Sequence, residues 1–369
     1  MPQFSRRSFL SLSAAASAAA VLRPMGEAQM AASARPPVHA ANAIMIDSNE
    51  NPLGPCQSAR EAATAIVQQG GRYAFHLTQE FTSTFAKMEG LDPEWVTATV
   101  GSTPPLGLTV IAFTSPQKSY VTADPGYEFG MFTAQANGAR VVKVPLTKTY
   151  AHDVRAMLAT APDAGLFYIC TPNNPTGTLT PHADIEYLVA NKPKDSIVLV
   201  DEAYIHFNEA PSAIDLVKAG KDVIVLRTFS KIYGMAGLRC GLIIARPELM
   251  KKAMGMGGWN PMPVTAVMAA KASLNDQQLV PERRRINASI RQQTFEWLDR
   301  NGYFYIPSEA NHFMVDTKRP GQQVREAMAK ENVLIGRIWP VMPTYVRITV
   351  GTQEEMEKFQ AAWQKVMKG

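Results

Sequence analysis

The segment "DVIVLRTFSKIYGMAGLRCGLIIA", residues 222–245, decides the fold and raises the functional question. Two runs rich in Val, Ile and Leu flank a loop that carries Ser230, Lys231 and Arg239 among glycines. Short apolar runs closed by Gly, Asp or Ser are typical of buried strands. A lysine between two such strands is either a solvated surface group or a group kept for chemistry, and the rest of the chain favours the second.

The same pattern continues on the N-terminal side of this segment. Between residues 95 and 245, helix-length segments separate strand-like runs, which read WVTATVG, SYVTAD, ARVVKVPL, GLFYICTP, SIVLVDEAY, DVIVLRTFS and RCGLIIA. Apolar strands separated by helices predict an α/β fold with a mostly parallel seven-stranded sheet covered on both faces. Such sheets bind ligands at the carboxyl ends of their strands, where the polar clusters of this sequence fall.

The pattern changes after residue 260. Helical stretches over 264–274 and 282–301 are followed by two short strands, NHFMVD and YVRITV, and by a charged C-terminal helix. We predict a large domain over residues 71–260 and a smaller α+β domain over 261–369. Residues 35–70 are predicted to form an N-terminal segment that packs with the small domain.

The first 34 residues have the features of a targeting segment. Arg6 and Arg7 precede a weakly hydrophobic run of Ala and Ser, and small residues follow at 32–34. This arrangement resembles a twin-arginine export signal, which predicts a periplasmic or otherwise exported protein. A run so short and so rich in Ala and Ser would span a bilayer poorly, so cleavage is favoured over a permanent anchor. A disordered basic tail is the alternative.

Composition narrows the function classes. The 369 residues are 46% hydrophobic and 19% charged, as in soluble globular proteins. Loss of the first 34 residues would remove three arginines and one glutamate, so the net charge of +5 would fall by two. The remaining charge is too small and too scattered to indicate nucleic-acid binding. Cys56, Cys170 and Cys240 lack the spacing of metal ligands, and we predict no metal site.

Seven motifs occur in a fixed order along the chain. They are SNENPLGP (48–55), GRY (71–73), DPGYE (124–128), TPNNPTG (171–177), DEAY (201–204), SKIYGMAGLRCG (230–241) and VRITVG (346–351). Together they resemble the histidinol-phosphate aminotransferase-like branch of the class I/II aminotransferases, from about Ile44 to the C-terminus. The resemblance implies a fold-type I transferase, pyridoxal 5'-phosphate as the cofactor, and a homodimer with shared active sites.

The resemblance assigns the catalytic roles. Lys231 matches the lysine that holds the cofactor as an imine and moves the α-proton, which needs an amine. Asp201 matches the carboxylate that keeps the pyridine nitrogen protonated. Asn174 and Tyr204 match the donors to the ring oxygen, and Tyr127 would stack on the ring face. Lys231, Asp201 and Tyr204 are therefore the predicted catalytic residues.

The cofactor phosphate requires backbone amides at a helix start, hydroxyl groups and a cation. Ser102 and Thr103 supply the loop, while Ser230 and Arg239 supply a hydroxyl and a guanidinium. Tyr73 resembles the tyrosine that this family contributes from the neighbouring subunit.

The substrate side is less defined. By resemblance, Arg347 holds the substrate α-carboxylate with help from Asn51, because its planar fork suits a carboxylate. Arg337 meets a distal phosphate or carboxylate of the substrate, or it pairs with a glutamate at the surface. His76 lies near the cofactor tyrosine and is a further candidate for substrate binding, although a lone histidine is more often structural.

Two segments depart from the family pattern. "GSTPPLG" at 101–107 replaces a loop of the GSSE type, and "GRYAFHLTQE" at 71–80 replaces the common RYPD. We predict an aminotransferase that moves an amino group from a free amino acid to a 2-oxo acid. The departures leave an alternative, a lyase, decarboxylase or cyclase that uses the same cofactor without net transamination. A non-catalytic binding protein is disfavoured because the cofactor residues are all retained.

Overall fold

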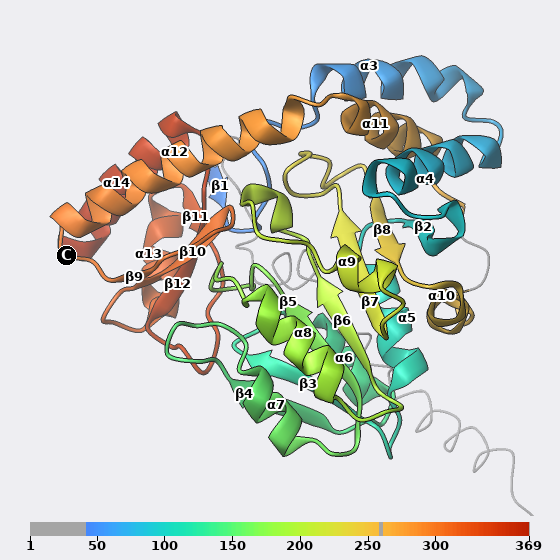
Figure 1. The fold of residues 1–369 in the computed structure, drawn as a ribbon. Helices are drawn as coiled ribbons and strands as arrows, with labels where there is room; N and C mark the ends of the chain where they lie inside the picture. Colours follow the sequence, from blue (N-terminus) through green and yellow to red (C-terminus); the bar gives the residue numbers. More distant parts are fainter. Residues whose placement is uncertain (1–41, 258–260, 369) are drawn as a thin grey trace, which may run out of the picture.

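The computed structural model describes residues 42–257 and 261–368 (Figure 1). The predicted export signal at residues 1–34 lies outside these described residues. All seven predicted strands form one sheet with the order β2-β8-β7-β6-β5-β3-β4. The strands are β2 (Val96–Thr99), β3 (Ser119–Asp124), β4 (Val141–Pro145), β5 (Ala164–Cys170), β6 (Ile197–Asp201), β7 (Val223–Thr228) and β8 (Gly241–Ile244).

The sheet is mostly parallel, as predicted. Strands β4, β3, β5, β6 and β7 pair in parallel, whereas β8 runs antiparallel to both β7 and β2. The N-terminal end of β8 therefore lies at the edge where the parallel strands have their carboxyl ends. Every residue of β5, β6, β7 and β8 is buried, so both faces of the central sheet are covered.

Helices connect the strands of this sheet and pack against it. Helix α5 contacts β5, α6 contacts β3 and β4, and α7, α8 and α9 contact β4, β6 and β7. Helices α3, α4 and α11 lie together at one end of the molecule (Figure 1), where α11 packs against both others. Their bounds are α3 (Gln57–Ile66), α4 (Phe75–Glu89), α5 (Thr103–Phe113), α6 (Phe129–Ala136), α7 (Val154–Thr160), α8 (His182–Asn191), α9 (Ile214–Lys218), α10 (Pro247–Met254) and α11 (Val264–Asn275).

A second, smaller unit contains most of the C-terminal third, drawn in orange and red in Figure 1. An antiparallel sheet of order β12-β10-β9 packs with three helices around its own hydrophobic core. The elements are α12 (Leu279–Arg300), β9 (Tyr305–Ile306), β10 (His312–Asp316), α13 (Gly321–Lys330), β11 (Val333–Ile335), β12 (Tyr345–Thr349) and α14 (Gln353–Lys368). The described residues also contain the short 3-10 helices η1 (Val67–Gln69), η2 (Pro93–Trp95) and η3 (Ile205–Phe207).

The chain passes from the core of the large sheet to the second core within helix α12. Buried side chains of α11 belong to the core of the large sheet. Helix α12 starts in that core at Leu279 and ends in the second core at Phe295 and Leu298. The helices predicted at 264–274 and 282–301 are confirmed, and the division of the chain into domains stays a prediction.

Residues 44–51 belong spatially with the C-terminal unit, whereas helix α3, which follows them, packs against α11 and contributes Ala59 to the core of the large sheet. Strand β1 (Ile44–Ile46) pairs in parallel with β11, and in Figure 1 it lies in blue among the orange and red elements. The backbone N–H of Asn49 donates to Oγ1 of Thr349 at 2.9 Å, and Asn311 Nδ2 donates to the carbonyl of Asn49 at 3.0 Å. These bonds carry residues 47–51 from the small sheet to the edge of the large sheet.

A membrane-spanning helix is not found in the described part of the chain, where each helix is too short or too polar to cross a bilayer.

Candidate active site

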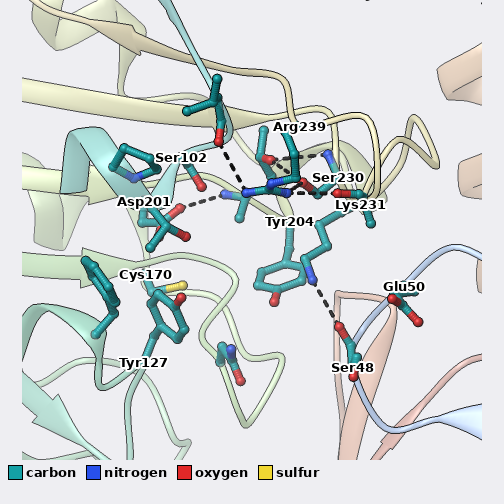
Figure 2. A pocket seen from close by; sticks show the side chains of 18 of the residues that line it. Ser48, Glu50, Ser102, Tyr127, Cys170, Asp201, Tyr204, Ser230, Lys231 and Arg239 are labelled. Atoms are coloured by element: carbon teal, nitrogen blue, oxygen red, sulfur yellow. Dashed lines mark hydrogen bonds between the residues drawn. The ribbon is translucent and has the colours of Figure 1, made fainter. Parts of the chain in front are cut away.

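A cavity of about 610 Å³ opens at the carboxyl edge of the large sheet (Figure 2). Loops that follow β2, β5, β6 and β7 line one side of it, and residues of the 47–51 segment line the other. This is the place at which open α/β sheets bind ligands, because the strand ends leave a crevice there.

Lys231 projects into this cavity from the loop after β7. Its Nζ donates a hydrogen bond to the carbonyl oxygen of Ser48 at 3.2 Å and lies 5.6 Å from the centre of the Tyr204 ring. Figure 2 shows the side chain reaching across the cavity toward Ser48. The amine therefore points into the site and is not a solvated surface group, which answers the question that the opening segment raised.

Asp201 ends strand β6 beneath the cavity and is almost completely buried. Its carboxylate accepts hydrogen bonds from the hydroxyl of Tyr168 at 2.9 Å and from the backbone N–H of Ala203 at 3.1 Å. Burial raises the pKa of Asp201 from 3.8 to about 6, although these two hydrogen bonds and the nearby Lys231 act in the opposite direction. A buried carboxylate of this kind favours a protonated ring nitrogen as its partner.

The raised pKa of Asp201 predicts a pH dependence of the cofactor-free protein. The folded state holds this proton more tightly than the unfolded chain, so this contribution to stability is present below pH 4 and is lost as the pH rises through 6. The full loss amounts to roughly 3 kcal/mol. The quantity to compare is the free energy of unfolding of Asp201→Asn minus that of the unmodified protein. We expect this difference to rise by about 3 kcal/mol between pH 4 and pH 7.5.

Urea unfolding of both cofactor-free proteins across this pH range measures the difference directly. The asparagine also loses a hydrogen bond, but the free energy of that loss is the same at every pH. It therefore cancels when the stability differences at two pH values are compared. A stability difference that does not change with pH would show that the carboxyl group is ionised normally in the folded protein.

Hydrogen bonds tie Tyr204 and Arg347 to the 47–49 segment of the chain. The Nδ2 of Asn49 donates to the Tyr204 hydroxyl at 3.0 Å. Arg347 is 1% exposed and donates to Oδ1 of Asn174 at 2.8 Å and to the carbonyl of Asp47 at 2.7 Å. A guanidinium buried among neutral acceptors is well placed to receive an anion.

An anion cradle closes the opposite end of the cavity. Arg239 Nη1 donates to Ser230 Oγ at 3.1 Å, and its Nη2 donates to the carbonyl of Val100 at 3.3 Å. Gly101 has a φ of +90°, which favours glycine, and a Cβ there would lie 2.2 Å from Arg239 Nη2 and displace this guanidinium. Helix α5 begins at Thr103, whose backbone N–H has no partner within the helix.

The departure from the family loop is compatible with this cradle. Pro104 and Pro105 lie in the first turn of α5, where the missing N–H groups of proline cost no helical hydrogen bond. Glycine is also required at 241, because a Cβ there would lie 2.8 Å from the backbone nitrogen of Ser102.

The chemistry of these groups fits pyridoxal 5'-phosphate. The cradle matches its phosphate, Asp201 matches its ring nitrogen, and Lys231 matches its aldehyde. The predicted residues that line this one cavity are Ser102, Thr103, Tyr127, Asn174, Asp201, Tyr204, Ser230, Lys231 and Arg239.

Five other predicted residues are not among those that line the cavity in the described chain, and one of them is the buried Arg347. Asn51 donates to the carbonyl of Ile232 at 3.0 Å and lines a separate pocket of about 250 Å³. Tyr73 is 58% exposed and His76 is exposed. Arg337 pairs with Glu128, but this ion pair is largely buried and does not lie at the surface as the alternative had it.

Tyr168 and Asn49 contact site residues but were missed at the level of sequence. Tyr168 lies inside a strand whose apolar sequence indicates only a buried core position. Cys170 of this strand pairs with Asp201 in the sheet. Tyr168 comes two residues earlier, so its side chain lies on the same face of the sheet as that pair. Asn49, which donates to Tyr204, lies within a quoted motif but has no neighbour in sequence that indicates its role.

Comparisons with known proteins agree with this geometry. Residues 41–362 match the family described as aminotransferase class I and II. A histidinol-phosphate aminotransferase of Symbiobacterium thermophilum is 35% identical over 86% of this chain and 89% of its own length. An aromatic amino acid aminotransferase of Cutibacterium acnes is 33% identical over 90% of this chain and 94% of its own length.

A solved structure shows the same fold with the cofactor in place. The crystal structure of histidinol-phosphate aminotransferase from Sinorhizobium meliloti in complex with pyridoxal-5'-phosphate has a TM-score of 0.79. It is 25% identical to this chain, and the match covers 88% of this chain and 90% of that one. The chain therefore belongs to the aminotransferase class I and II family and is a pyridoxal phosphate-dependent aminotransferase.

Proposed function

We propose that the donor substrate is a free amino acid and that histidinol phosphate is not the preferred one. The observation that carries this proposal is the position of Arg347, a fully buried guanidinium held by Asn174 and by the backbone of Asp47, next to the segment that Lys231 contacts. A free amino acid presents one carboxylate beside its amino group, which is the anion that a planar guanidinium receives best.

The residues of the chain would divide the work as follows. When bound, the cofactor supplies the electron sink that stabilises negative charge at the substrate α-carbon. Lys231 Nζ would remove the α-proton and return a proton one step later, since it is the flexible base that projects into the cavity. Asp201 would hold the ring nitrogen protonated, and Tyr204 would donate to the ring oxygen.

An absorbance scan tests the proposed reaction. Single amino acids are added to the purified protein without any 2-oxo acid acceptor. Stable conversion of the bound cofactor to its aminated form, with an equal amount of 2-oxo acid, supports transamination and shows which amino acids react. Product that accumulates while the starting absorbance persists would instead indicate a lyase, decarboxylase or cyclase.

The proposed assembly is a homodimer with shared sites. Tyr73 and Phe75 are both exposed and stack on one another, with ring centres 5.7 Å apart, at the start of α4. Exposed aromatic side chains in one cluster are typical of an interface. Mixing an inactive Lys231→Ala protein with a Tyr73→Ala protein should restore sites that take Lys231 and Tyr73 from different subunits. No gain in activity after mixing would argue against shared sites.

Export by the twin-arginine route is proposed from the sequence of the first 34 residues. Arg6 and Arg7 precede an Ala-rich run, and export in the folded state would let the cofactor be inserted beforehand. Replacement of both arginines with lysine should leave the protein in the cytoplasmic fraction of the expressing bacterium. Equal amounts of the two proteins in the periplasmic fraction would contradict this proposal.

A further inference from the structure

An ion pair joins the large sheet to the small unit beside the active site. Glu128 lies between Tyr127 and Phe129, which both line the cavity, and Arg337 follows strand β11. The Nη1 of Arg337 donates to Oε2 of Glu128, and each side chain is 15% exposed. Glu128 is also the N-cap residue of α6, where a carboxylate is favoured by the helix dipole.

Trp339 connects this pair to the residue that would bind the α-carboxylate. Its ring centre lies 4.2 Å from Cζ of Arg337 and 5.5 Å from Cζ of Arg347. The indole is completely buried, and its Nε1 donates to the carbonyl of Gly126 at 3.1 Å. Two guanidinium groups thus share one aromatic ring, and Glu128 offsets the charge of the second.

Arg337 still has donors to offer. Its Nε and Nη2 are inaccessible to solvent and have no hydrogen-bond partner among the described residues. Buried donors are normally paired, so these two are suited to an acceptor that a ligand brings. Because Glu128 already supplies the negative charge, a neutral acceptor satisfies them without adding a second anion to the pair.

We propose that Glu128 determines which substrate side chains the enzyme accepts. It restricts the subsite beside Arg337 and Trp339 to uncharged side chains that contain a ring. This inference rests on the proposed function. A phenol or imidazole could accept from Arg337 next to the Trp339 ring, whereas a carboxylate would have to compete with Glu128 for the same guanidinium.

The test compares substrates of different charge in Glu128→Gln. The rate of the amino-donor half-reaction is measured with L-tyrosine, L-aspartate and L-glutamate. The ratio of kcat/KM for each anionic donor to that for tyrosine should rise by about tenfold or more, since one opposing charge is removed. In Arg337→Gln the same ratio should fall, because Glu128 then repels an anion without a compensating cation.

Glu331→Gln serves as the matched control. Glu331 also pairs with a basic side chain, Lys365 at 2.7 Å, but does so on the small unit and away from the cavity lining. It should leave the ratio within about twofold of the unmodified protein. Ratios that stay within the same range in both Glu128→Gln and Arg337→Gln would overturn the inference.

Binding of succinate separates this inference from the proposed reaction. Succinate is an unreactive dicarboxylate, and its dissociation constant can be measured from the absorbance of the bound cofactor. Glu128→Gln should bind succinate about tenfold more tightly, whichever donor the enzyme uses. If no free amino acid reacts but succinate binding responds as expected, the proposed substrate is wrong and the role of Glu128 stands. Unchanged succinate affinity would overturn that role even if tyrosine reacts.

Discussion

Lys231→Ala is expected to lower the rate of transamination by roughly 10³-fold or more, because the site then lacks both its covalent anchor and its base. The amine projects into the cavity, and the backbone carbonyl of Ser48 that it contacts cannot transfer protons in its place. The variant should still bind the cofactor through Asp201 and the anion cradle. Reduction with borohydride should therefore fix the cofactor to the unmodified protein but not to the variant.

Lys358→Ala provides a control of the same residue type. Lys358 pairs with Glu354 at 2.6 Å on α14, and its side chain is 56% exposed. Its removal should change neither turnover nor the fixation of the cofactor. Mass spectrometry of the reduced protein identifies the modified residue, so a cofactor attached to any other lysine would refute the assignment of Lys231.

Arg347→Gln is expected to lower kcat/KM for an amino acid donor by about 10²- to 10³-fold, since a buried charged partner of the carboxylate is lost. Arg347→Lys should recover only part of this loss, because an ammonium group cannot form two parallel hydrogen bonds with a carboxylate. Arg347 also holds Asn174 and the backbone of Asp47, so part of the loss could come from a displaced cofactor contact.

A donor without a carboxylate separates these two effects. L-tyrosine and tyramine differ only by that group, so the ratio of their kcat/KM values reports its recognition alone. We expect the ratio to fall by about the same 10²- to 10³-fold in Arg347→Gln. In Arg284→Lys, whose native arginine pairs with Glu209 outside the cavity, the ratio should not change. If the ratio in Arg347→Gln equals the ratio in the unmodified protein, another group binds the carboxylate.

The sheet could be predicted because its strands are apolar throughout and end in polar motifs. Residues such as Asp201 and Lys231 come directly after buried strands, so their location at one edge follows from the parallel topology. The antiparallel direction of β8 is less evident from the sequence, although it brings Arg239 to that edge.

Contacts between distant segments could not be predicted from local patterns. Glu128 and Arg337 are 209 positions apart, and nothing near either residue indicates the other. Asn51 illustrates the same limit, because its side chain holds the carbonyl of Ile232, the residue after the catalytic lysine. Tyr73 and His76 are exposed in the described chain, so a role for either in the site depends on the homodimer proposed above.

The hydrogen bond between Asn49 and Thr349 affects when the active site can form during synthesis of the chain. Asn49 contacts Thr349 across 300 positions, although the last strand of the large sheet ends at Ile244. At translation rates of roughly 5–20 residues per second, the ribosome needs about 5–20 s to make the intervening 100 or so residues. The nascent sheet can form in that interval, while residues 47–49 wait for their partners. A chain released before residue 347 would thus hold the lysine loop but lack the substrate arginine, and catalysis can begin only after Arg347 has been made.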